Sequence, residues 1–320
     1  MAALFYGILS LSMSFLNKAV ISQYRFNFPL FILSCQMMLT FVVLEVMRAS
    51  GKFGLPHITM PAVRMFALPA FCYSMHATLS LVALEGMNIP MYGAIKRCTP
   101  LFNLILSVVY LKKPMPSPRL ITSIIIITFG CSVAAMTDPT FNGFAFLMGG
   151  ASVLLQSLQQ TLLQQCGENH LSPLHVLHLN SCISVVPFLI LTILQGELTD
   201  VLTYEYIQDT SFHMIFTLLL VMGLLLNFSM FLCTMLNCAL TTSVVGVTKS
   251  VFQTIIGFFA FGGVTLHPVN VAGIALNTTG GVMYTYEKYQ DQKRKLRKTN
   301  FEDTTAQQGG WELKEKLPVI

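Results

Sequence analysis

The sequence predicts an all-α membrane protein of ten transmembrane helices, and three observations lead to this fold class. Of the residues, 54% are hydrophobic and only 10% are charged, against roughly 25% charged in an ordinary soluble domain. Ten stretches approach the roughly 20 apolar residues that a helix needs to cross a bilayer. Basic residues gather in the connections of one side, which is the pattern of cytosolic loops.

The predicted spans follow one another with short connections, so we expect one membrane domain over residues 1–287. In order, they are 3–21, 29–48, 63–85, 90–111, 118–136, 141–165, 173–195, 211–235, 239–262 and 268–287. The first has no basic leader before it and no small-residue cleavage site after it, which predicts a retained helix rather than a signal peptide. Residues 288–320 begin with a basic run and predict a disordered cytosolic tail.

The distribution of lysine and arginine predicts that both termini are cytosolic. With the N-terminus in the cytosol, fourteen of the nineteen basic residues lie on the cytosolic side and only Arg25 lies on the far side. The far side instead carries the acidic segment GELTDVLTYEYIQD, residues 196–209. This is the asymmetry that the positive-inside rule describes.

Residues 1–136 and 141–287 each hold five spans and share a weak internal similarity. The aligned positions are Asn88 with Asn237 and, one residue later in register, Pro118 with Pro268 and Gly130 with Gly280. Because five is odd, equivalent helices in the two halves would run in opposite directions. The pattern predicts an inverted repeat, which typically places a substrate site near the bilayer midplane between the halves.

The other four basic residues, Lys18, Lys96, Arg97 and Lys249, lie inside predicted spans. A lysine or arginine at a helix centre costs roughly 2.5–3.5 kcal/mol on insertion scales. Acidic residues inside the spans are scarce, and the ninth span has none in its interior. We therefore expect these cations to face an aqueous cavity that binds an anion.

Each cation has an alternative role. Lys18 is close to the end of its span, and it either lines the cavity or snorkels to the interface. Adjacent helical residues point about 100° apart, so we expect at least one of Lys96 and Arg97, but not both, to contact one ligand. Lys249 lies near the middle of its span, where snorkelling is hardest.

The surroundings of Lys249 support a cavity at the ninth span. Thr242, Gly246, Lys249 and Gln253 follow i, i+4, i+7, i+11 spacing and share one helix face. The alternative for Thr242 and Gly246 is helix packing through small and hydroxylated residues. A second stripe, Gln156, Gln160 and Gln164 in the sixth span, favours interhelical hydrogen bonding over cavity lining.

Catalytic and metal-binding signatures are missing from the sequence. It has no H-E-x-x-H, G-x-S-x-G or P-loop motif, and its eight cysteines form no C-x-x-C pair. We therefore expect no enzyme, no cofactor, no metal and no nucleic-acid partner. The open alternatives are an organic-anion transporter and a membrane scaffold or trafficking factor that transports nothing.

Four segments carry a resemblance to a known family: FLNKAVIS (15–22), IPMYGAIKRCTPL (89–101), NCALTTSVVGVTKSV (237–251) and GIALNTTGGVMYTYEKY (273–289). Residues 5–290 resemble the nucleotide-sugar transporters of the drug/metabolite transporter superfamily, most of all the UDP-sugar branch, solute carrier family 35 subfamily D. The third segment is the most specific. In that family an alanine- and threonine-rich start of the ninth helix precedes a glycine and a lysine that contacts nucleotide.

The resemblance implies ten helices in two inverted five-helix repeats that work by alternating access. A cytosolic nucleotide sugar would be exchanged for luminal nucleoside monophosphate across the Golgi or endoplasmic reticulum membrane, by a monomer or a homodimer. The alternative cargo is another organic anion, such as a sugar phosphate. The candidate substrate-binding residues are Lys249, Lys96, Arg97, Lys18, Asn180, Tyr92, Thr242, Gly246 and Gln253.

Two departures from the family pattern bear on the substrate. GDP-mannose members carry Gly-Ala-Leu-Asn-Lys in the ninth helix, whereas residues 245–249 read Val-Gly-Val-Thr-Lys here, which argues against guanine recognition. Relatives often have an aromatic pair before an asparagine in the seventh helix. Here HVLHLNSC retains only the asparagine, Asn180.

Overall fold

The structure is a computed structural model, and its described residues form helices and connecting turns. They are residues 2–51, 54–87, 89–136, 142–169, 171–237, 239, 241–243, 245–246, 249, 268–269, 271–273, 275–287, 289–291 and 293–294. No β-strand occurs among these residues, as the predicted fold class requires.

Ten helices have defined bounds, and two further stretches are helical in part. The helices are α1 (Ala2–Tyr24), α2 (Pro29–Ala49), α3 (Met60–Glu85), α4 (Ile89–Lys96), α5 (Thr99–Val109), α6 (Pro118–Met136), α7 (Gly143–Glu168), α8 (Pro173–Leu194), α9 (Glu197–Leu202) and α10 (Thr210–Leu236). Helical residues also occur between 239 and 249. The C-terminal helical segment, as it is called below, comprises residues 271–273, 275–287 and 289–291.

Five of the described helices are long and apolar enough to cross a membrane. They are α2, α3, α8, α10 and residues 2–21 of α1. The 26 residues of α7 match α3 in length, but its glutamine-rich second half makes it less apolar. Exposed leucine, isoleucine, valine and phenylalanine side chains are frequent on these helices, which suits a surface covered by lipid.

The structure departs from the predicted spans in two places. The predicted span 90–111 is interrupted after Lys96, and its two parts are α4 and α5. The short helix α9 in the acidic connection was not predicted, because six residues are too few for a periodic apolar pattern. Most of the ninth span and most of the tail lie outside the described residues.

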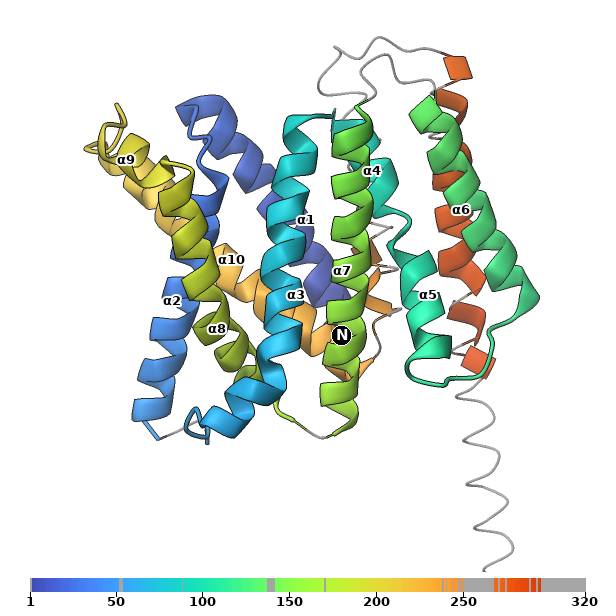
Figure 1. The fold of residues 1–320 in the computed structure, drawn as a ribbon, viewed down its shortest axis with the longest axis horizontal. Helices are drawn as coiled ribbons and strands as arrows, with labels where there is room; N and C mark the ends of the chain where they lie inside the picture. The colour runs from blue at the N-terminus through green and yellow to red at the C-terminus, as the bar shows by residue number, and fades with distance from the viewer. Residues whose placement is uncertain are drawn as a thin grey trace, which may run out of the picture.

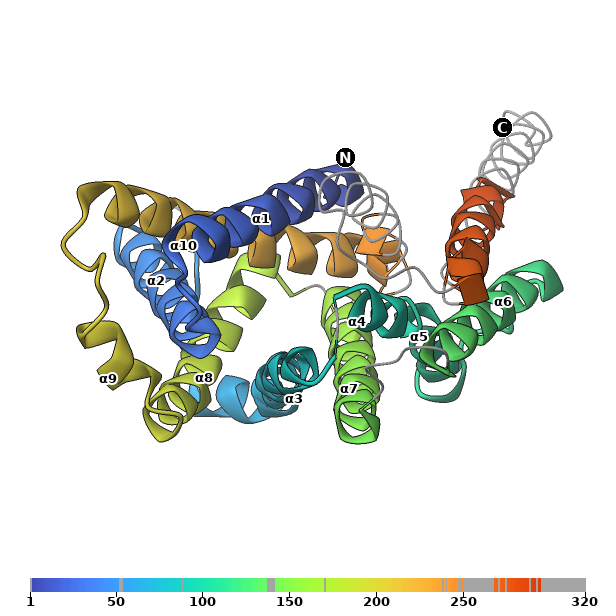
Figure 2. The same ribbon diagram turned by 90° about the horizontal axis from the view of Figure 1, so that it is seen from above.

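The helices pack in pairs that join the two halves of the chain. Figures 1 and 2 show α3 beside α7, α2 beside α8 and α1 beside α10. One buried cluster combines Leu44 of α2, Phe66 of α3, Leu163 of α7, Val176 of α8 and Phe231 of α10. Residues from both halves of the chain therefore form one shared core.

Glu197 of α9 ties the start of α2 to the second half of the chain. Its carboxylate accepts hydrogen bonds from the backbone N–H groups of Leu30 at 3.3 Å and Phe31 at 2.7 Å. These groups have no partner within α2, because the first turn of a helix leaves its N–H groups free. Glu197 is buried, so one long-range side chain caps the helix.

Substituting Glu197 should make stability less dependent on pH. Burial raises the pKa of the Glu197 carboxyl, and the two backbone hydrogen bonds offset part of that rise. A carboxyl with a raised pKa in the folded state stabilises the fold at low pH and loses this contribution as pH rises through the raised value. From pH 4.5, its ordinary pKa, to neutral pH, the unfolding temperature of wild type should fall relative to Glu197→Gln. An unchanged difference would contradict this, and Glu205→Gln in the same connection is the control.

Two glycines bring α6 and the C-terminal helical segment into close contact. A Cβ atom at Gly130 would lie 2.5 Å from the backbone N of Asn277, and one at Gly280 would lie 2.9 Å from the backbone N of Ile127. The Asn277 side chain donates from Nδ2 to the Ile127 carbonyl oxygen at 2.8 Å. The backbones of the two helices are in direct contact at these positions, which leaves no room for a methyl group on either helix.

Gly130→Ala should therefore destabilise the protein. Overpacking typically costs about 1–3 kcal/mol, which exceeds the roughly 0.5–1 kcal/mol that alanine gains over glycine inside a helix. Gly150→Ala is the matched control, because no described atom outside its own stretch of helix lies within 4 Å of the methyl group that it would add. Thermal unfolding in detergent should show a lower midpoint for Gly130→Ala only; equal midpoints would argue against the close contact.

Candidate functional site

The helix that carries Lys96 is interrupted at Arg97 and Cys98, inside a predicted span. The Cys98 N–H donates to the carbonyl oxygen of Ile95 at 2.9 Å, so the backbone tightens from an i−4 to an i−3 hydrogen bond. Thr99 Oγ1 donates to the Lys96 carbonyl oxygen at 2.6 Å, and Pro100 opens α5 without an N–H group. Interrupted helices recur at the substrate sites of transporters.

Lys96, at the end of α4, points toward α7. Its ammonium donates to Gln156 Oε1 at 2.8 Å and to Ser152 Oγ at 3.3 Å, and it lies 5.5 Å from the centroid of the Tyr92 ring. Both partners are neutral. No described carboxylate forms an ion pair with Lys96, so its positive charge keeps the capacity to bind an anion.

Polar groups of α3 complete the surroundings of Lys96. Ser152 Oγ lies 2.6 Å from Ser80 Oγ and donates to the His76 carbonyl oxygen at 2.9 Å. The His76 ring meets Tyr73 edge-on at 5.5 Å, and the Tyr73 hydroxyl donates to Asn227 Oδ1 on α10 at 3.2 Å. Tyr73, His76 and Ser80 thus form a line of polar residues along α3, called the α3 line below, that extends from the surroundings of Lys96 to α10.

This line on α3 was not predicted. As a single polar group of an apolar span, His76 indicates nothing by itself. Tyr73, His76 and Ser80 nevertheless follow i, i+3, i+7 spacing, which places them on one helix face. That spacing is the signal that would have revealed them.

Arg97 points away from Lys96. It is 2% exposed, and its Nη1 donates to Asn277 Oδ1 at 3.1 Å and to Thr278 Oγ1 at 3.3 Å. The neighbouring cations therefore serve different interfaces, α7 for Lys96 and the C-terminal helical segment for Arg97. The divergence agrees with the angle between adjacent helical residues.

Asn180 lies on α8 with its amide fully buried. Within the described part of the chain neither its Oδ1 nor its Nδ2 has a hydrogen-bond partner, and its side chain is 0% exposed. A buried amide without partners is costly, so a polar ligand or water would stabilise it. One helical turn later, the Ser184 hydroxyl is in the same situation.

His178, two residues before Asn180, is held by a carboxylate. Its Nε2 lies 3.0 Å from Glu45 Oε1 on α2, and Glu45 also pairs with Arg48 at 2.6 Å. This network joins α2 to α8. His178 therefore has a packing role, separate from Asn180.

Residues at the start of the ninth span differ in what they contact. Thr242 is buried, and its hydroxyl lies 2.9 Å from that of Thr234 on α10, which favours the packing alternative. Gly246 has no described atom within 4 Å of an added Cβ. Lys249 is half-buried, and it forms no ion pair within the described chain. Gln253 and the side chain of Lys18 lie outside the described residues.

The glutamine stripe of α7 connects three helices by hydrogen bonds, as predicted. Gln160 Oε1 accepts from Asn103 Nδ2 on α5 at 2.9 Å. Gln164 Oε1 accepts from the backbone N–H of Ala239 at 3.0 Å, which fixes the start of the ninth span. Gln156 is the exception, because its acceptor faces Lys96.

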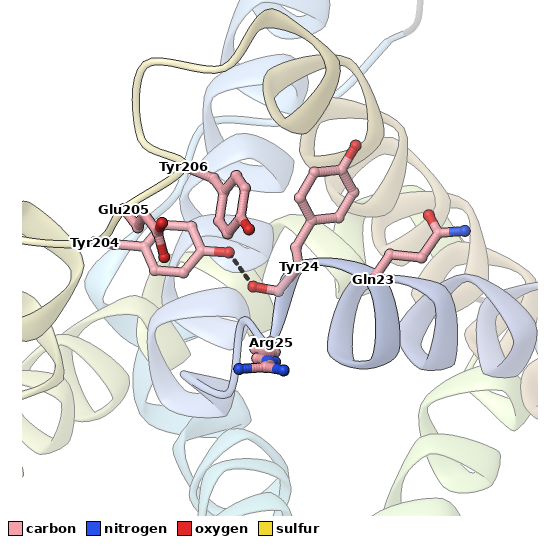
Figure 3. Close-up of a pocket in the computed structure, with 6 residues that line it drawn as sticks. All are labelled: Gln23, Tyr24, Arg25, Tyr204, Glu205 and Tyr206. Carbon is pink, nitrogen blue, oxygen red and sulfur yellow. Dashed lines mark hydrogen bonds between the residues drawn. The ribbon is translucent and has the colours of Figure 1, made fainter.

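A pocket of about 500 Å³ lies away from these cations, between the end of α1 and the turn after α9. Figure 3 shows its lining of Gln23, Tyr24, Arg25, Tyr204, Glu205 and Tyr206. The Tyr204 hydroxyl donates to the Tyr24 carbonyl oxygen, and the Tyr24 and Tyr206 rings meet edge-on at 5.8 Å. The tyrosine rings pack against one another edge-on or at a tilt, and no two of them face each other in parallel.

Comparison with known proteins settles the family. Residues 1–285 match the Triose-phosphate Transporter family. The chain belongs to this family. It is similar to the UDP-galactose/UDP-glucose transporter 7 of Arabidopsis thaliana, at 39% identity over 92% of this chain and 91% of the relative. A putative UDP-sugar transporter of Dictyostelium discoideum is 32% identical over 84% of this chain and 70% of the relative.

The relatives confirm the predicted resemblance to the UDP-sugar branch of the nucleotide-sugar transporters. Human nucleotide sugar transporter SLC35D2 is 29% identical to this chain, over 89% of this chain and 85% of the human protein. The fold recurs in a protein solved by crystallography, with a TM-score of 0.62 at 12% identity over 89% of this chain and 95% of that one. That likeness concerns the fold alone.

Proposed function

We propose that this chain is an antiporter that brings a cytosolic UDP-sugar into the lumen of the Golgi or endoplasmic reticulum in exchange for nucleoside monophosphate. The observation that carries the proposal is Lys96, a cation inside the helix bundle whose hydrogen-bond partners are the neutral Ser152 and Gln156. A phosphate group would supply the missing negative charge. Charge-assisted hydrogen bonds of this kind are roughly twice as strong as neutral ones.

The proposed substrate site combines groups from several helices. Lys96 and Lys249 would bind the diphosphate, Tyr92 would border it, and Asn180 would hydrogen-bond the base or the sugar. Arg97 and Thr242 support the site by packing. Lys18, a cation inside the first predicted span, and Gly246 and Gln253, which share the predicted helix face of Lys249, remain proposals from the sequence.

The proposed mechanism is alternating access between two inverted five-helix repeats, and the glycine contact supports it. Gly130 lies against Asn277, and Gly280 lies against Ile127. The offset of 150 residues between Gly130 and Gly280 also relates Ile127 to Asn277. Each glycine therefore contacts the residue that is equivalent to the other glycine's contact. Such a reciprocal contact is expected where two equivalent halves meet at a two-fold symmetric interface.

A sugar phosphate is the second candidate substrate, because the family description names triose phosphate. Both substrates carry phosphate and would use the same cations. They differ in the base, which a sugar phosphate lacks. The UDP-sugar has priority because the relatives with the highest identity given above are named for UDP-sugars.

Exchange in proteoliposomes tests the proposal. Purified protein would be reconstituted with UMP inside, and uptake of radiolabelled UDP-glucose, UDP-galactose and UDP-N-acetylglucosamine would be measured against empty vesicles. The proposal expects uptake of at least one UDP-sugar that internal UMP stimulates. A parallel assay would measure uptake of radiolabelled triose phosphate. Uptake of triose phosphate without uptake of any UDP-sugar would favour the sugar-phosphate transporter, and no uptake of either substrate class would favour the scaffold.

The predicted orientation can be tested in cells that express the protein. Epitope tags at both ends should be accessible to antibodies after the plasma membrane alone is permeabilised, because both termini are proposed to be cytosolic. A tag that needs full permeabilisation would contradict the topology. Co-staining with Golgi and endoplasmic reticulum markers would assign the membrane.

A further inference from the structure

The geometry points to Arg97 as a positioning residue that fixes the interruption between α4 and α5, so that Lys96 faces α7. This role differs from the substrate contact that the sequence predicted for Arg97. The inference rests on the proposed function, since it assigns the residue that prepares the proposed anion site. It is independent of which anion is bound.

The first step is the anchorage of Arg97 itself. The side chain is 2% exposed, and one guanidinium nitrogen donates to both Asn277 Oδ1 and Thr278 Oγ1. These two acceptors are adjacent on the C-terminal helical segment. Both N–H bonds of Nη1 lie in the guanidinium plane, so the two acceptors hold the planar group in one orientation. This restricts the Arg97 side chain and the backbone that carries it.

The second step is that Asn277 is itself held in place. Its Nδ2 donates to the carbonyl oxygen of Ile127 on α6 at 2.8 Å. An amide that donates on one side must turn its oxygen to the other, and that oxygen meets Arg97. Close packing at Gly130 and Gly280 leaves this part of the molecule little freedom. Arg97 is thus attached to a tightly packed pair of helices.

The third step connects Arg97 to Lys96 through the backbone. The Arg97 N–H donates to the Gly93 carbonyl oxygen at 3.2 Å and continues α4, whereas the next residue already turns. With Arg97 fixed on the C-terminal helical segment, the preceding side chain must point about 100° away from it, toward a different interface. Lys96 accordingly meets Ser152 and Gln156, and it could not do so if α4 rotated by one residue.

The experiment compares four variants in proteoliposome exchange: Arg97→Gln, Arg97→Lys, Asn277→Leu and the double variant Arg97→Gln/Asn277→Leu. A positioning role expects a loss of about tenfold or more in exchange for both Arg97→Gln and Asn277→Leu, the factor typical of a hydrogen bond to a charged group. The double variant should be no worse than the worse single variant. Arg97→Lys should rescue little, because lysine keeps the charge but has a shorter side chain and no planar guanidinium group to reach both acceptors.

A direct substrate contact would give the opposite pattern. Arg97→Lys would then retain most of the exchange and Asn277→Leu would lose almost none, and either result would overturn the inference. If Arg97→Gln fails to fold, Thr278→Val removes a single acceptor with little change of volume and should give a smaller loss of the same kind. Normal exchange in folded Thr278→Val and Asn277→Leu would also overturn it.

A second readout separates this inference from the proposed function. Lys96 in the detergent-purified protein can be modified with an amine reagent, and its rate can be followed by mass spectrometry without any substrate. Loss of the anchor should speed the modification about tenfold, because the ammonium leaves Gln156 and Ser152. Thr122→Val, on the exposed face of α6, is the control. Unchanged rates in Arg97→Gln and Asn277→Leu would refute positioning even if the wild type transports nothing.

Discussion

Lys96→Gln should reduce nucleotide-sugar exchange by about tenfold to a hundredfold, because hydrogen bonds to charged groups contribute about 1.5–3 kcal/mol and each 1.4 kcal/mol is a factor of ten. The substituted amide still donates a hydrogen bond to Gln156 or Ser152, so the packing against α7 is largely kept. What it removes is the positive charge. The loss should therefore appear in uptake and in ligand affinity rather than in the unfolding temperature without ligand.

The control for this prediction is Lys113→Gln. Lys113 pairs with Glu168 at 2.8 Å, and both side chains are exposed, at 37% and 50%. Exposed ion pairs contribute only about 0–1 kcal/mol, so this variant should exchange like wild type. A similar loss in both variants would mean that uptake responds to net charge, and full activity of a folded Lys96→Gln would remove Lys96 from the site.

The fold class followed from composition and span length, whereas the details depended on contacts that a sequence does not display. The apolar period marked the helices of α2, α3, α8 and α10 to within a few residues. It did not reveal the interruption after Lys96, because largely apolar residues continue on both sides of it, at 89–95 and 101–111. The Pro100 at the start of α5 was the local sign of that break.

The candidate site was predictable by residue type more than by geometry. A cation inside a span is costly, and this alone marked Lys96, Arg97 and Lys249. The different directions of Lys96 and Arg97 could be expected from helix geometry, but which of them met α7 could not. That choice depends on Asn277, which lies 180 residues further along the chain.

The α3 line of Tyr73, His76 and Ser80 shows a second limit. Serine and histidine are tolerated singly in membrane helices, so each one alone is compatible with simple packing. Only their meeting with Ser152 on α7 and Asn227 on α10 distinguishes this face. Such contacts depend on how three helices pack against one another, which the hydrophobic periodicity of the sequence does not determine.

Lys249→Ala should abolish the stabilisation of the protein by UMP and UDP-sugars without lowering the stability of the ligand-free protein. A ligand that binds the folded state at a hundred times its Kd stabilises it by about 2.7 kcal/mol, and this shift should disappear with the lysine. Lys249 forms no ion pair with the described residues, and removing such a cation from a span relieves an insertion cost of roughly 2.5–3.5 kcal/mol. The ligand-free unfolding temperature should therefore stay equal or rise.

The Lys249 prediction distinguishes a substrate-binding role from a structural role, because the two roles affect the ligand-free unfolding temperature and the nucleotide-induced shift differently. If Lys249 were a structural residue held by the surrounding helices, its removal would lower the ligand-free unfolding temperature and leave the nucleotide shift of the remaining folded protein intact. Thermal unfolding of wild type and Lys249→Ala, each with and without UMP, separates the two cases. GMP in place of UMP is the matched ligand control, because Val-Gly-Val-Thr-Lys at residues 245–249 argues against guanine recognition, and it should give little shift in either protein.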